Sequence, residues 1–366
     1  MESEAAEAWI SGYLACNPEY TSAAPLEGGV SNYVYRLTRA DGSSVILKHA
    51  EPHAIHDENW AMDTKRVKYE HAALSSISKA LLSSAAAREA NVEVPSAIAY
   101  DADKYNLILS DCGAATKDLH TAFPSLTPAQ RVDTGRRLGL WLASLHHCNA
   151  IDKATFYADE TRDRQGMDQR IDLLSAGLPA GGTPDEKAAF VALLEPFAAA
   201  AIQRSSRCVV HGDFWPGNVL VGPPHEKDDA AQDLLAVIDW EGVGLGTGAL
   251  DVGAMAAEAW LLCHFHRESA RASVVEPEDF GMLEAFLGSY LEAAGQVEEA
   301  FVEQAVVQFA INLSVGRGGK QLMRPVKGLG CEIVELVMGK KEDDWKRGML
   351  ALGWGTEAWR DWFAGQ

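Results

Sequence analysis

Residues 211–221 read His-Gly-Asp-Phe-Trp-Pro-Gly-Asn-Val-Leu-Val, and residues 235–240 follow with Leu-Ala-Val-Ile-Asp-Trp. Each segment contains a short apolar run, and together the runs predict two strands joined by a polar loop. Asp213 and Asn218 lie in a tight turn before the first strand, and Asp239 ends the second. The hairpin is therefore expected to bring two carboxylates and one amide together.

These three side chains suit phosphoryl transfer, which needs bound metal ions and a carboxylate that orients the attacking hydroxyl. We expect Asp213 to accept a hydrogen bond from a substrate hydroxyl, and Asn218 and Asp239 to ligate Mg²⁺, which prefers oxygen. Asp and Asn often serve only as turn residues. The complete pattern, H-G-D-x-x-x-x-N with a following I-D-W, favours a phosphotransferase over that alternative.

One lysine and one glutamate occupy positions that should face an apolar core. Lys48 ends the predicted strand Val45–Lys48, and Glu70 lies on the apolar stripe of a helix predicted near residues 63–82. Each charge is costly to bury alone, so we expect the two to form an ion pair. The alternative for each is a side chain that reaches water at the edge of the core.

A turn of small residues precedes the first strong strand and is a candidate for phosphate contacts. Its candidate residues are Gly28, Gly29, Ser31 and Asn32. Glycines let backbone N–H groups approach phosphates closely, although a Gly-Gly pair alone usually marks only a turn. Its position before the strand that carries Lys48 favours the phosphate role.

A second candidate segment comprises Ser110, Asp111 and Cys112, which follow the apolar strand Asn106–Leu109. Strand patterns end here and helical patterns begin, as expected for a hinge between two lobes. Backbone groups at such a hinge can contact the edge of an adenine ring, so we expect these residues to line the nucleotide site.

The order of patterns predicts an α+β chain with two lobes. Strand signals surround a turn signal at Asp41-Gly42 and indicate a small N-terminal lobe, residues 1–111, with an antiparallel sheet. Helical patterns dominate a large C-terminal lobe, residues 112–366. Its first long helix is expected to start with Thr127 as N-cap and Pro128 at the first helical position. The residues expected to face inward are Val132, Leu138, Leu142 and Leu145.

Composition excludes several classes of protein. The chain has no run of about 18 uncharged apolar residues, and its acidic start, Met1–Ala5, lacks a secretory signal. We therefore expect a cytoplasmic protein without a membrane segment. The formal net charge of −20 would repel nucleic acid and anionic membranes. It is compatible with a cationic small substrate, but simple solubility is the favoured interpretation.

The remaining polar residues are expected to serve structure. Six scattered cysteines without a C-x-x-C pair predict free thiols: Cys16, Cys112, Cys148, Cys208, Cys263 and Cys331. For His146 a structural hydrogen bond is favoured over a catalytic role, and for Asp251 a helix cap is favoured over lining a substrate pocket. His264 and His266 have spacing unsuited to zinc.

The order of the glycine-rich turn, Lys48, Glu70, the hinge, H-G-D-x-x-x-x-N and I-D-W-E resembles the aminoglycoside phosphotransferase and choline kinase-like superfamily, which has a protein-kinase-like fold. The resemblance spans about residues 28–260. It implies that Asp213 is the catalytic carboxylate and that Asn218 and Asp239 hold Mg²⁺. It further implies that Lys48 contacts the α- and β-phosphates of ATP.

Residues and resemblance together predict an ATP- and Mg²⁺-dependent kinase that transfers the γ-phosphoryl group to a hydroxyl of a small molecule. Amino sugars, sugars and amino alcohols are the expected acceptors, and methylthioribose or fructosamine kinase-like activity is an open alternative. A nucleotide-binding pseudokinase that acts as a scaffold is a second alternative, disfavoured because every expected catalytic position is filled. The chain lacks the arginine of H-R-D and an A-P-E element, which argues against a protein substrate. The oligomeric state is not predicted.

Overall fold

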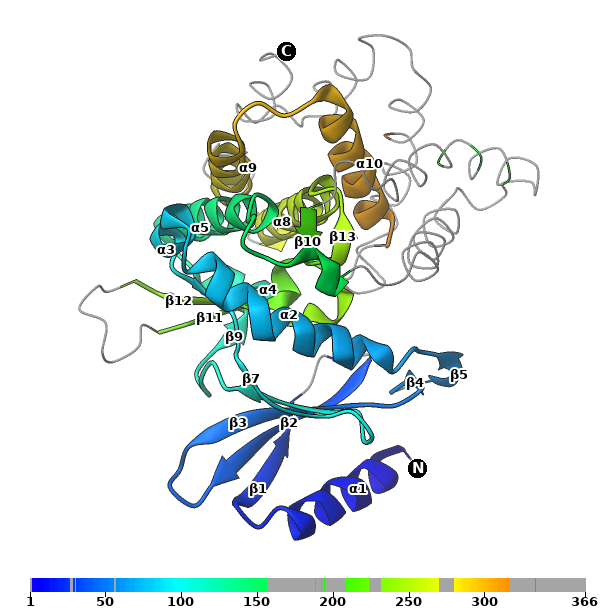
Figure 1. Ribbon diagram of the computed structural model, residues 1–366. Helices are drawn as coiled ribbons and strands as arrows, with labels where there is room; N and C mark the ends of the chain where they lie inside the picture. The colour runs from blue at the N-terminus through cyan, green and yellow to red at the C-terminus, as the bar shows by residue number, and fades with distance from the viewer. Residues whose placement is uncertain are drawn as a thin grey trace.

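The computed structural model describes residues 2–156, 208–223, 232–269 and 280–315, apart from residues 27, 28, 30 and 56, together with four isolated positions. Within this part of the chain a small strand-rich lobe lies at the bottom of Figure 1, and a larger, mainly helical lobe lies above it. The predicted α+β class and two-lobed arrangement are confirmed.

A five-stranded antiparallel sheet forms the small lobe. In spatial order its strands are β1 (Tyr20–Pro25), β2 (Asn32–Arg39), β3 (Ser44–Ala50), β8 (Asn106–Ser110) and β7 (Ala97–Asp101). The three strands expected from sequence correspond to β2, β3 and β8. Gly42, in the predicted turn between β2 and β3, has a φ of +82°, a conformation that glycine adopts without a Cβ clash.

The helix α1 (Glu2–Cys16) packs on one face of this sheet, although no sequence pattern had indicated it. Figure 1 shows it beside β1. Trp9 of α1 stacks on His49 of β3 with ring centroids 4.1 Å apart. Because neighbouring strand residues point to opposite faces, Leu47 packs under α1 while Lys48 points away from it.

The helix α2 (Lys65–Leu81) covers the opposite face and matches the helix predicted near residues 63–82. The apolar stripe of this helix is buried and consists of Val67, Leu74, Ile77 and Leu81. Glu70 is buried on the same stripe. A hairpin of β4 (His53–Ala54) and β5 (Asp57–Ala61) precedes α2, and α3 (Ala85–Ala90) follows it.

The first long helix of the large lobe is α5 (Pro128–His146), which begins where the sequence predicts. Thr127 and Gln130 form a reciprocal capping box at its start. Leu138, Leu142 and Leu145 are buried as expected, but the expectation for Val132 is wrong, because its side chain is 43% exposed. Val132 lies in the second turn of α5, where the surface is open to solvent.

A four-stranded sheet lies where the two lobes meet. In spatial order its strands are β6 (Val92–Glu93), β12 (Leu234–Val237), β11 (Val219–Gly222) and β9 (Lys117–Asp118). β11 and β12 form the predicted antiparallel hairpin, with Val219 opposite Val237. β6 pairs with β12 in parallel. A strand that precedes residue 111 therefore belongs to the sheet whose hairpin lies between Asn218 and Asp239.

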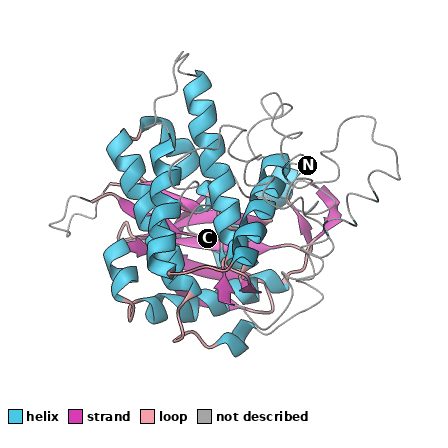
Figure 2. Cartoon of the chain, turned by 90° about the horizontal axis from the view of Figure 1, so that it is seen from above, coloured by secondary structure: helices cyan, strands magenta, loops and turns pink. Residues whose placement is uncertain are grey.

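In the view from above, long helices lie in front of the strands (Figure 2). The helices of the large lobe besides α5 are α4 (Leu119–Ala122), α8 (Ala249–Ser269), α9 (Gly281–Ala294) and α10 (Glu299–Val315). Two short strands, β10 (Cys208–Val210) and β13 (Gly244–Gly246), pair beside them. Single 3₁₀ turns are η1 (Phe123–Ser125), η2 (Lys153–Phe156), η4 (Pro216–Asn218) and η5 (Trp240–Gly242).

Some predictions fall outside the described residues, namely Gly28, Cys331 and the helices expected after residue 315. Within the described residues no helix is long and apolar enough to cross a membrane. The five cysteines that the structure describes are free thiols, as predicted. His264 stacks on Trp260, and no group of three metal-binding side chains occurs in this part of the chain.

Candidate active site

The H-G-D motif forms a tight loop that starts at the end of β10. Gly212 has a φ of +82°, and a Cβ on it would lie 2.1 Å from the carbonyl oxygen of Gly242. Only glycine therefore fits this position. Asn218 donates a hydrogen bond from Nδ2 to Oδ2 of Asp213 at 3.1 Å and to the Asp213 carbonyl at 2.9 Å. The loop thus holds the carboxylate and the amide against each other.

Asp251 holds the same loop from beneath. Its carboxylate accepts hydrogen bonds from the backbone N–H groups of His211 at 2.7 Å and Gly212 at 2.9 Å. His146 Nε2 lies 3.2 Å from the same carboxylate, and its Nδ1 lies 2.9 Å from the Tyr290 hydroxyl. The structural role expected for His146 is confirmed. The expectation that Asp251 caps a helix is wrong, because α8 begins at Ala249 and the carboxylate is used by the loop.

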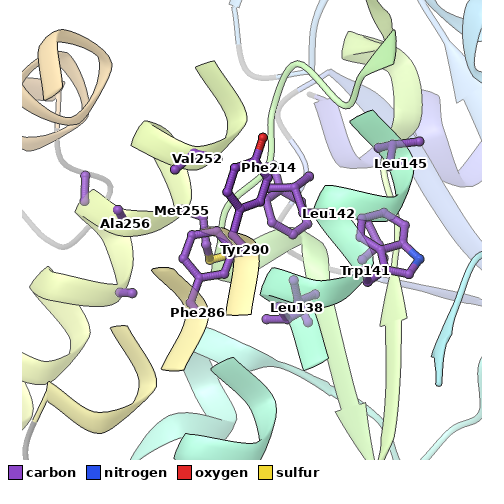
Figure 3. Packing of buried hydrophobic residues seen from close by; sticks show 14 of the residues in the cluster. Leu138, Trp141, Leu142, Leu145, Phe214, Val252, Met255, Ala256, Phe286 and Tyr290 are labelled. Atoms are coloured by element: carbon purple, nitrogen blue, oxygen red, sulfur yellow. The ribbon is translucent and has the colours of Figure 1, made fainter. Parts of the chain in front are cut away.

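An aromatic cluster anchors the loop in the core. Phe214, the residue after Asp213, is fully buried, and its ring centroid lies 5.8 Å from that of Trp141 and 6.4 Å from that of Phe286. Figure 3 shows Phe214 among side chains of α5, α8 and α9. Because closely packed interiors resist displacement, this anchor limits movement of Asp213.

Asp239 follows β12 in the left-handed region, with a φ of 66°, which is rare for a residue other than glycine. Non-glycine residues in this region are enriched at functional sites. The N–H of Ile238 donates to the Asn218 carbonyl at 3.0 Å, so the segments that carry Asn218 and Asp239 lie side by side. Sequence reasoning placed the two residues at one site, and the structure brings their segments together.

Lys48 lies between Glu70 and Asp239. Its Nζ is 2.7 Å from Oε2 of Glu70 and 2.5 Å from Oδ1 of Asp239. Burial disfavours the ammonium, but Asp239, Glu70 and Glu241 together raise the pKa of Lys48 above its ordinary value. Burial also raises the pKa of Glu70, an effect that Lys48 opposes. The expected Lys48–Glu70 ion pair is present, with Asp239 as a second carboxylate partner.

The donor set at Asn218 and Asp239 fits a hard divalent cation. The amide nitrogen of Asn218 is engaged by Asp213, which leaves the amide oxygen as the atom that can ligate a metal. The Asp239 side chain is 31% exposed, and its carboxylate oxygens are ligands of the kind that Mg²⁺ prefers. All candidate donors are oxygen atoms, without a thiol or imidazole that would favour zinc.

The glycine-rich turn is only partly described, since Gly28 lies outside the described residues. Gly29 is exposed. The carbonyl of Ser31 accepts a hydrogen bond from Arg66, and the side chain of Asn32 donates one to Glu241 at 2.7 Å. The Asn32 side chain is therefore used by the protein itself, and the backbone of the turn is the part suited to phosphates.

At the hinge, side chains point into the small lobe. Asp111 accepts hydrogen bonds from Arg36 at 2.6 Å and from the Ser44 hydroxyl at 2.7 Å. Burial opposes ionisation, but these bonds lower the pKa of Asp111 below its ordinary value. The Ser110 hydroxyl accepts a hydrogen bond from the Ser96 N–H at 2.9 Å, and burial raises the pKa of Cys112 to about 12. Ser110 and Asp111 thus support the hinge with their side chains.

Two residues at this site had no role in the sequence analysis. Arg66 lies one turn before Glu70 on α2 and is 6% exposed. Glu241, two residues after Asp239, contacts Asn32 and Arg66. The signal for Arg66 was present, because a helix residue four positions before Glu70 shares its buried face. Glu241 was part of the I-D-W-E motif, but its partners are distant in sequence.

The sequence from residue 22 to residue 299 matches the model of the phosphotransferase enzyme family. The chain belongs to this family. It is 24% identical over 309 residues to 4-hydroxytryptamine kinase of Psilocybe cyanescens. This alignment covers 77% of this chain and 83% of the kinase. The 4-hydroxytryptamine kinase of Psilocybe cubensis is also 24% identical, over 294 residues and 77% of each chain. The chain is thus a phosphotransferase that acts on a hydroxyl of a small molecule.

Solved structures share the fold. A choline/ethanolamine kinase family protein from Mesorhizobium loti superposes with a TM-score of 0.50 at 15% identity, covering 97% of this chain and all of that one. A mutant aminoglycoside 2′-phosphotransferase in complex with GDP has a TM-score of 0.50 at 11% identity and covers 98% of this chain and 99% of its own. The two-lobed arrangement is therefore the protein-kinase-like fold that the sequence resemblance predicts.

Proposed function

We propose that this phosphotransferase uses ATP and Mg²⁺ to phosphorylate a hydroxyl of an amine-bearing small molecule. The observation that carries the proposal is the convergence of four side chains from two lobes. Lys48 contacts Asp239, Asn218 contacts Asp213, and the Ile238–Asn218 backbone bond joins the two pairs. Such a set can hold phosphates, a cation and an acceptor hydroxyl within one small volume.

In the proposed reaction Asp213 accepts a hydrogen bond from the acceptor hydroxyl and orients its oxygen toward the γ-phosphorus. The new bond forms between that oxygen and phosphorus, while the bond from the γ-phosphorus to the β–γ bridging oxygen breaks. The hydroxyl proton passes to Asp213 and then to solvent, and ADP leaves. Asn218 keeps the Asp213 carboxylate in place through its amide N–H.

Lys48 is proposed to contact the α- and β-phosphates, with Glu70 holding its ammonium in position. Asn218 and Asp239 would hold Mg²⁺, which when bound offsets negative charge on the phosphate oxygens. The turn that contains Gly28, Gly29, Ser31 and Asn32 is proposed to cover the phosphates with its backbone. Backbone groups of residues 110–112 would contact the adenine, with the lobe boundary at residue 111.

Two observations support an amine-bearing acceptor. The relatives that align over 77% of this chain are named for 4-hydroxytryptamine, a hydroxylated amine. The chain also has a net charge of −20, which raises the local concentration of cationic solutes near its surface. Hydroxylated arylalkylamines and choline-like amino alcohols are therefore the acceptors to test before amino sugars and neutral sugars.

The test is a phosphorylation screen with ATP and Mg²⁺ over hydroxytryptamines, amino alcohols, amino sugars and neutral sugars, read by ADP release and by ³¹P NMR of the product. The proposal expects a new phosphate-ester signal with an amine-bearing acceptor. A phosphate ester only with neutral sugars, such as methylthioribose, would contradict the acceptor class. Tight Mg²⁺-ATP binding without transfer to any acceptor would support the scaffold alternative instead.

A further inference from the structure

Arg66 is a buried guanidinium that the proposed reaction does not use. It lies on α2, and its side chain is 7% exposed. It donates hydrogen bonds to three backbone carbonyls from separate segments: Ser31 at 2.6 Å, Glu51 at 2.9 Å and Asp63 at 3.0 Å. A buried arginine with this many partners fixes the segments it contacts relative to one another.

Arg66 also belongs to a closed triad of side chains. Its Nε donates to Oδ1 of Asn32 at 3.2 Å, and Asn32 donates from Nδ2 to Oε2 of Glu241 at 2.7 Å. The Arg66 Nε lies 3.5 Å from the same Glu241 oxygen. Asn32 begins β2 and Glu241 lies in η5, so the triad spans 209 positions of the chain.

The location of the triad connects two parts of the proposed nucleotide site. Ser31 and Asn32 form the C-terminal end of the glycine-rich turn, and both are held by Arg66. Glu241 lies two residues after Asp239, in the single 3₁₀ turn that follows that residue. A displacement of Arg66 would therefore release the turn from the segment that carries Asp239.

We propose that Asn32, Arg66 and Glu241 are positioning residues that hold the glycine-rich turn against the Asp239 segment and thereby set the affinity for Mg²⁺-bound nucleotide. The proposal rests on the function proposed above. A turn already ordered in the free protein loses less conformational entropy when it closes on phosphates, so nucleotide binds more tightly. The planar guanidinium reaches several acceptors at once, which the point charge of a lysine cannot reproduce.

The test measures Mg²⁺-ADP and Mg²⁺-ATP binding by calorimetry in the full chain, because binding needs no acceptor. Arg66→Met and Asn32→Ala are expected to weaken binding by about tenfold or more, the loss typical of a charge-assisted hydrogen bond. Arg66→Lys keeps the charge and should recover part of the affinity. Arg136→Met is the matched control, because Arg136 is an arginine on α5 whose side chain is 39% exposed.

A purely structural role for Arg66 would lower the unfolding temperature without changing nucleotide affinity in protein that is still folded. Affinities of Asn32→Ala and Arg66→Met within about twofold of wild type would therefore overturn the proposal. If Arg66→Met does not fold, Asn32→Ala and Glu241→Gln decide the question, since neither introduces a new buried charge. Wild-type protein that binds no Mg²⁺-nucleotide would contradict the proposed function itself, whereas normal wild-type binding with unaffected variants contradicts only this inference.

Discussion

Nζ of Lys48 lies 2.5 Å from Oδ1 of Asp239, although the two residues are 191 positions apart in the chain. Glu70 lies on the other side of the ammonium at 2.7 Å. The small lobe therefore contributes a cation that directly contacts the proposed metal ligand of the large lobe. In the free protein Lys48 and Asp239 neutralise each other. In the proposed nucleotide complex the phosphates would contact Lys48, and Mg²⁺ would be held by Asp239.

The first prediction separates the structural and functional roles of Lys48. Lys48→Met leaves Glu70 as an uncompensated buried charge, so the free energy of unfolding should fall by about 3–5 kcal/mol. The double variant Lys48→Met/Glu70→Gln removes that charge and keeps an acceptor for the Trp240 N–H. It should regain part of the stability but not the phosphoryl transfer. Urea unfolding and ADP release measure the two effects, and a stable, fully active Lys48→Met protein would contradict both.

The second prediction concerns Asp239 as a ligand of Mg²⁺. Asp239→Asn keeps a residue type that tolerates the left-handed backbone and removes the charge. We expect the variant to lose most of the Mg²⁺ enhancement of ATP binding while binding metal-free ATP as wild type does. Asp103→Asn, a change at an exposed turn, is the control. An unchanged response to Mg²⁺ in titration calorimetry would remove Asp239 from the metal site.

The third prediction tests the close contact between α5 and α9. A Cβ at Gly139 would lie 2.2 Å from the Phe286 carbonyl oxygen, so Gly139→Ala should separate the helices and cost at least about 2 kcal/mol of stability. Gly288→Ala on α9 is the matched control. It has open space around it, and should stabilise the protein by about 0.5–1 kcal/mol. Thermal unfolding distinguishes the two variants. Equal effects of Gly139→Ala and Gly288→Ala on the unfolding temperature would contradict the close contact between α5 and α9.

The fourth prediction is a pH dependence at Asp251. Burial would raise the pKa of this carboxyl, but hydrogen bonds from His146 and the His211 backbone lower it below its ordinary value. A carboxyl whose pKa is lowered on folding stabilises the protein above its unfolded-state pKa, and the contribution is lost as pH falls through the folded-state pKa. Asp251→Asn should therefore cost about 1–3 kcal/mol at neutral pH, because one carboxylate oxygen becomes an NH₂ donor and one of the two loop N–H groups loses its acceptor.

The difference in unfolding free energy between wild type and Asp251→Asn should be constant near neutral pH and should shrink below about pH 4, where the carboxyl begins to take up a proton. Urea unfolding at a series of pH values measures it. A difference that grows as pH falls would show that Asp251 is not held as a carboxylate by the loop.

Local patterns allowed much of the site to be predicted. β11 and β12 follow from two apolar runs, and their hairpin places Asn218 near Asp239. The Lys48–Glu70 pair follows from two charges on faces with strand and helix periodicity. In each case the pattern that predicts the element lies within a few residues of sequence. For Lys48 and Glu70, the contact between the two elements follows because buried opposite charges pair.

Contacts between distant segments could not be predicted. Asp251 appeared to be a helix cap because helix starts favour Asp, and nothing local shows that its carboxylate binds two N–H groups some 40 positions away. The partners of Glu241 could not be predicted either, because they lie in β2 and α2, far away in the sequence. The apolar residues of α1 that pack on the sheet, Trp9, Ile10, Tyr13 and Leu14, do recur at helical spacing, but which surface they cover is set by strand residues far along the chain. Val132 matched a helical period, but it lies beside the start of α9 and stays 43% exposed.

In the proposed reaction Asp213 orients the acceptor hydroxyl for transfer from Mg²⁺-ATP. Single-turnover phosphorylation and Mg²⁺-ATP binding, both measured on Asp213→Asn with the acceptor that the screen identifies, examine this role. We expect a loss of about 10²–10⁴-fold in the transfer rate, the usual contribution of a positioned base, with nucleotide affinity close to wild type. A transfer rate near that of wild type, in a variant that binds Mg²⁺-ATP normally, would contradict it.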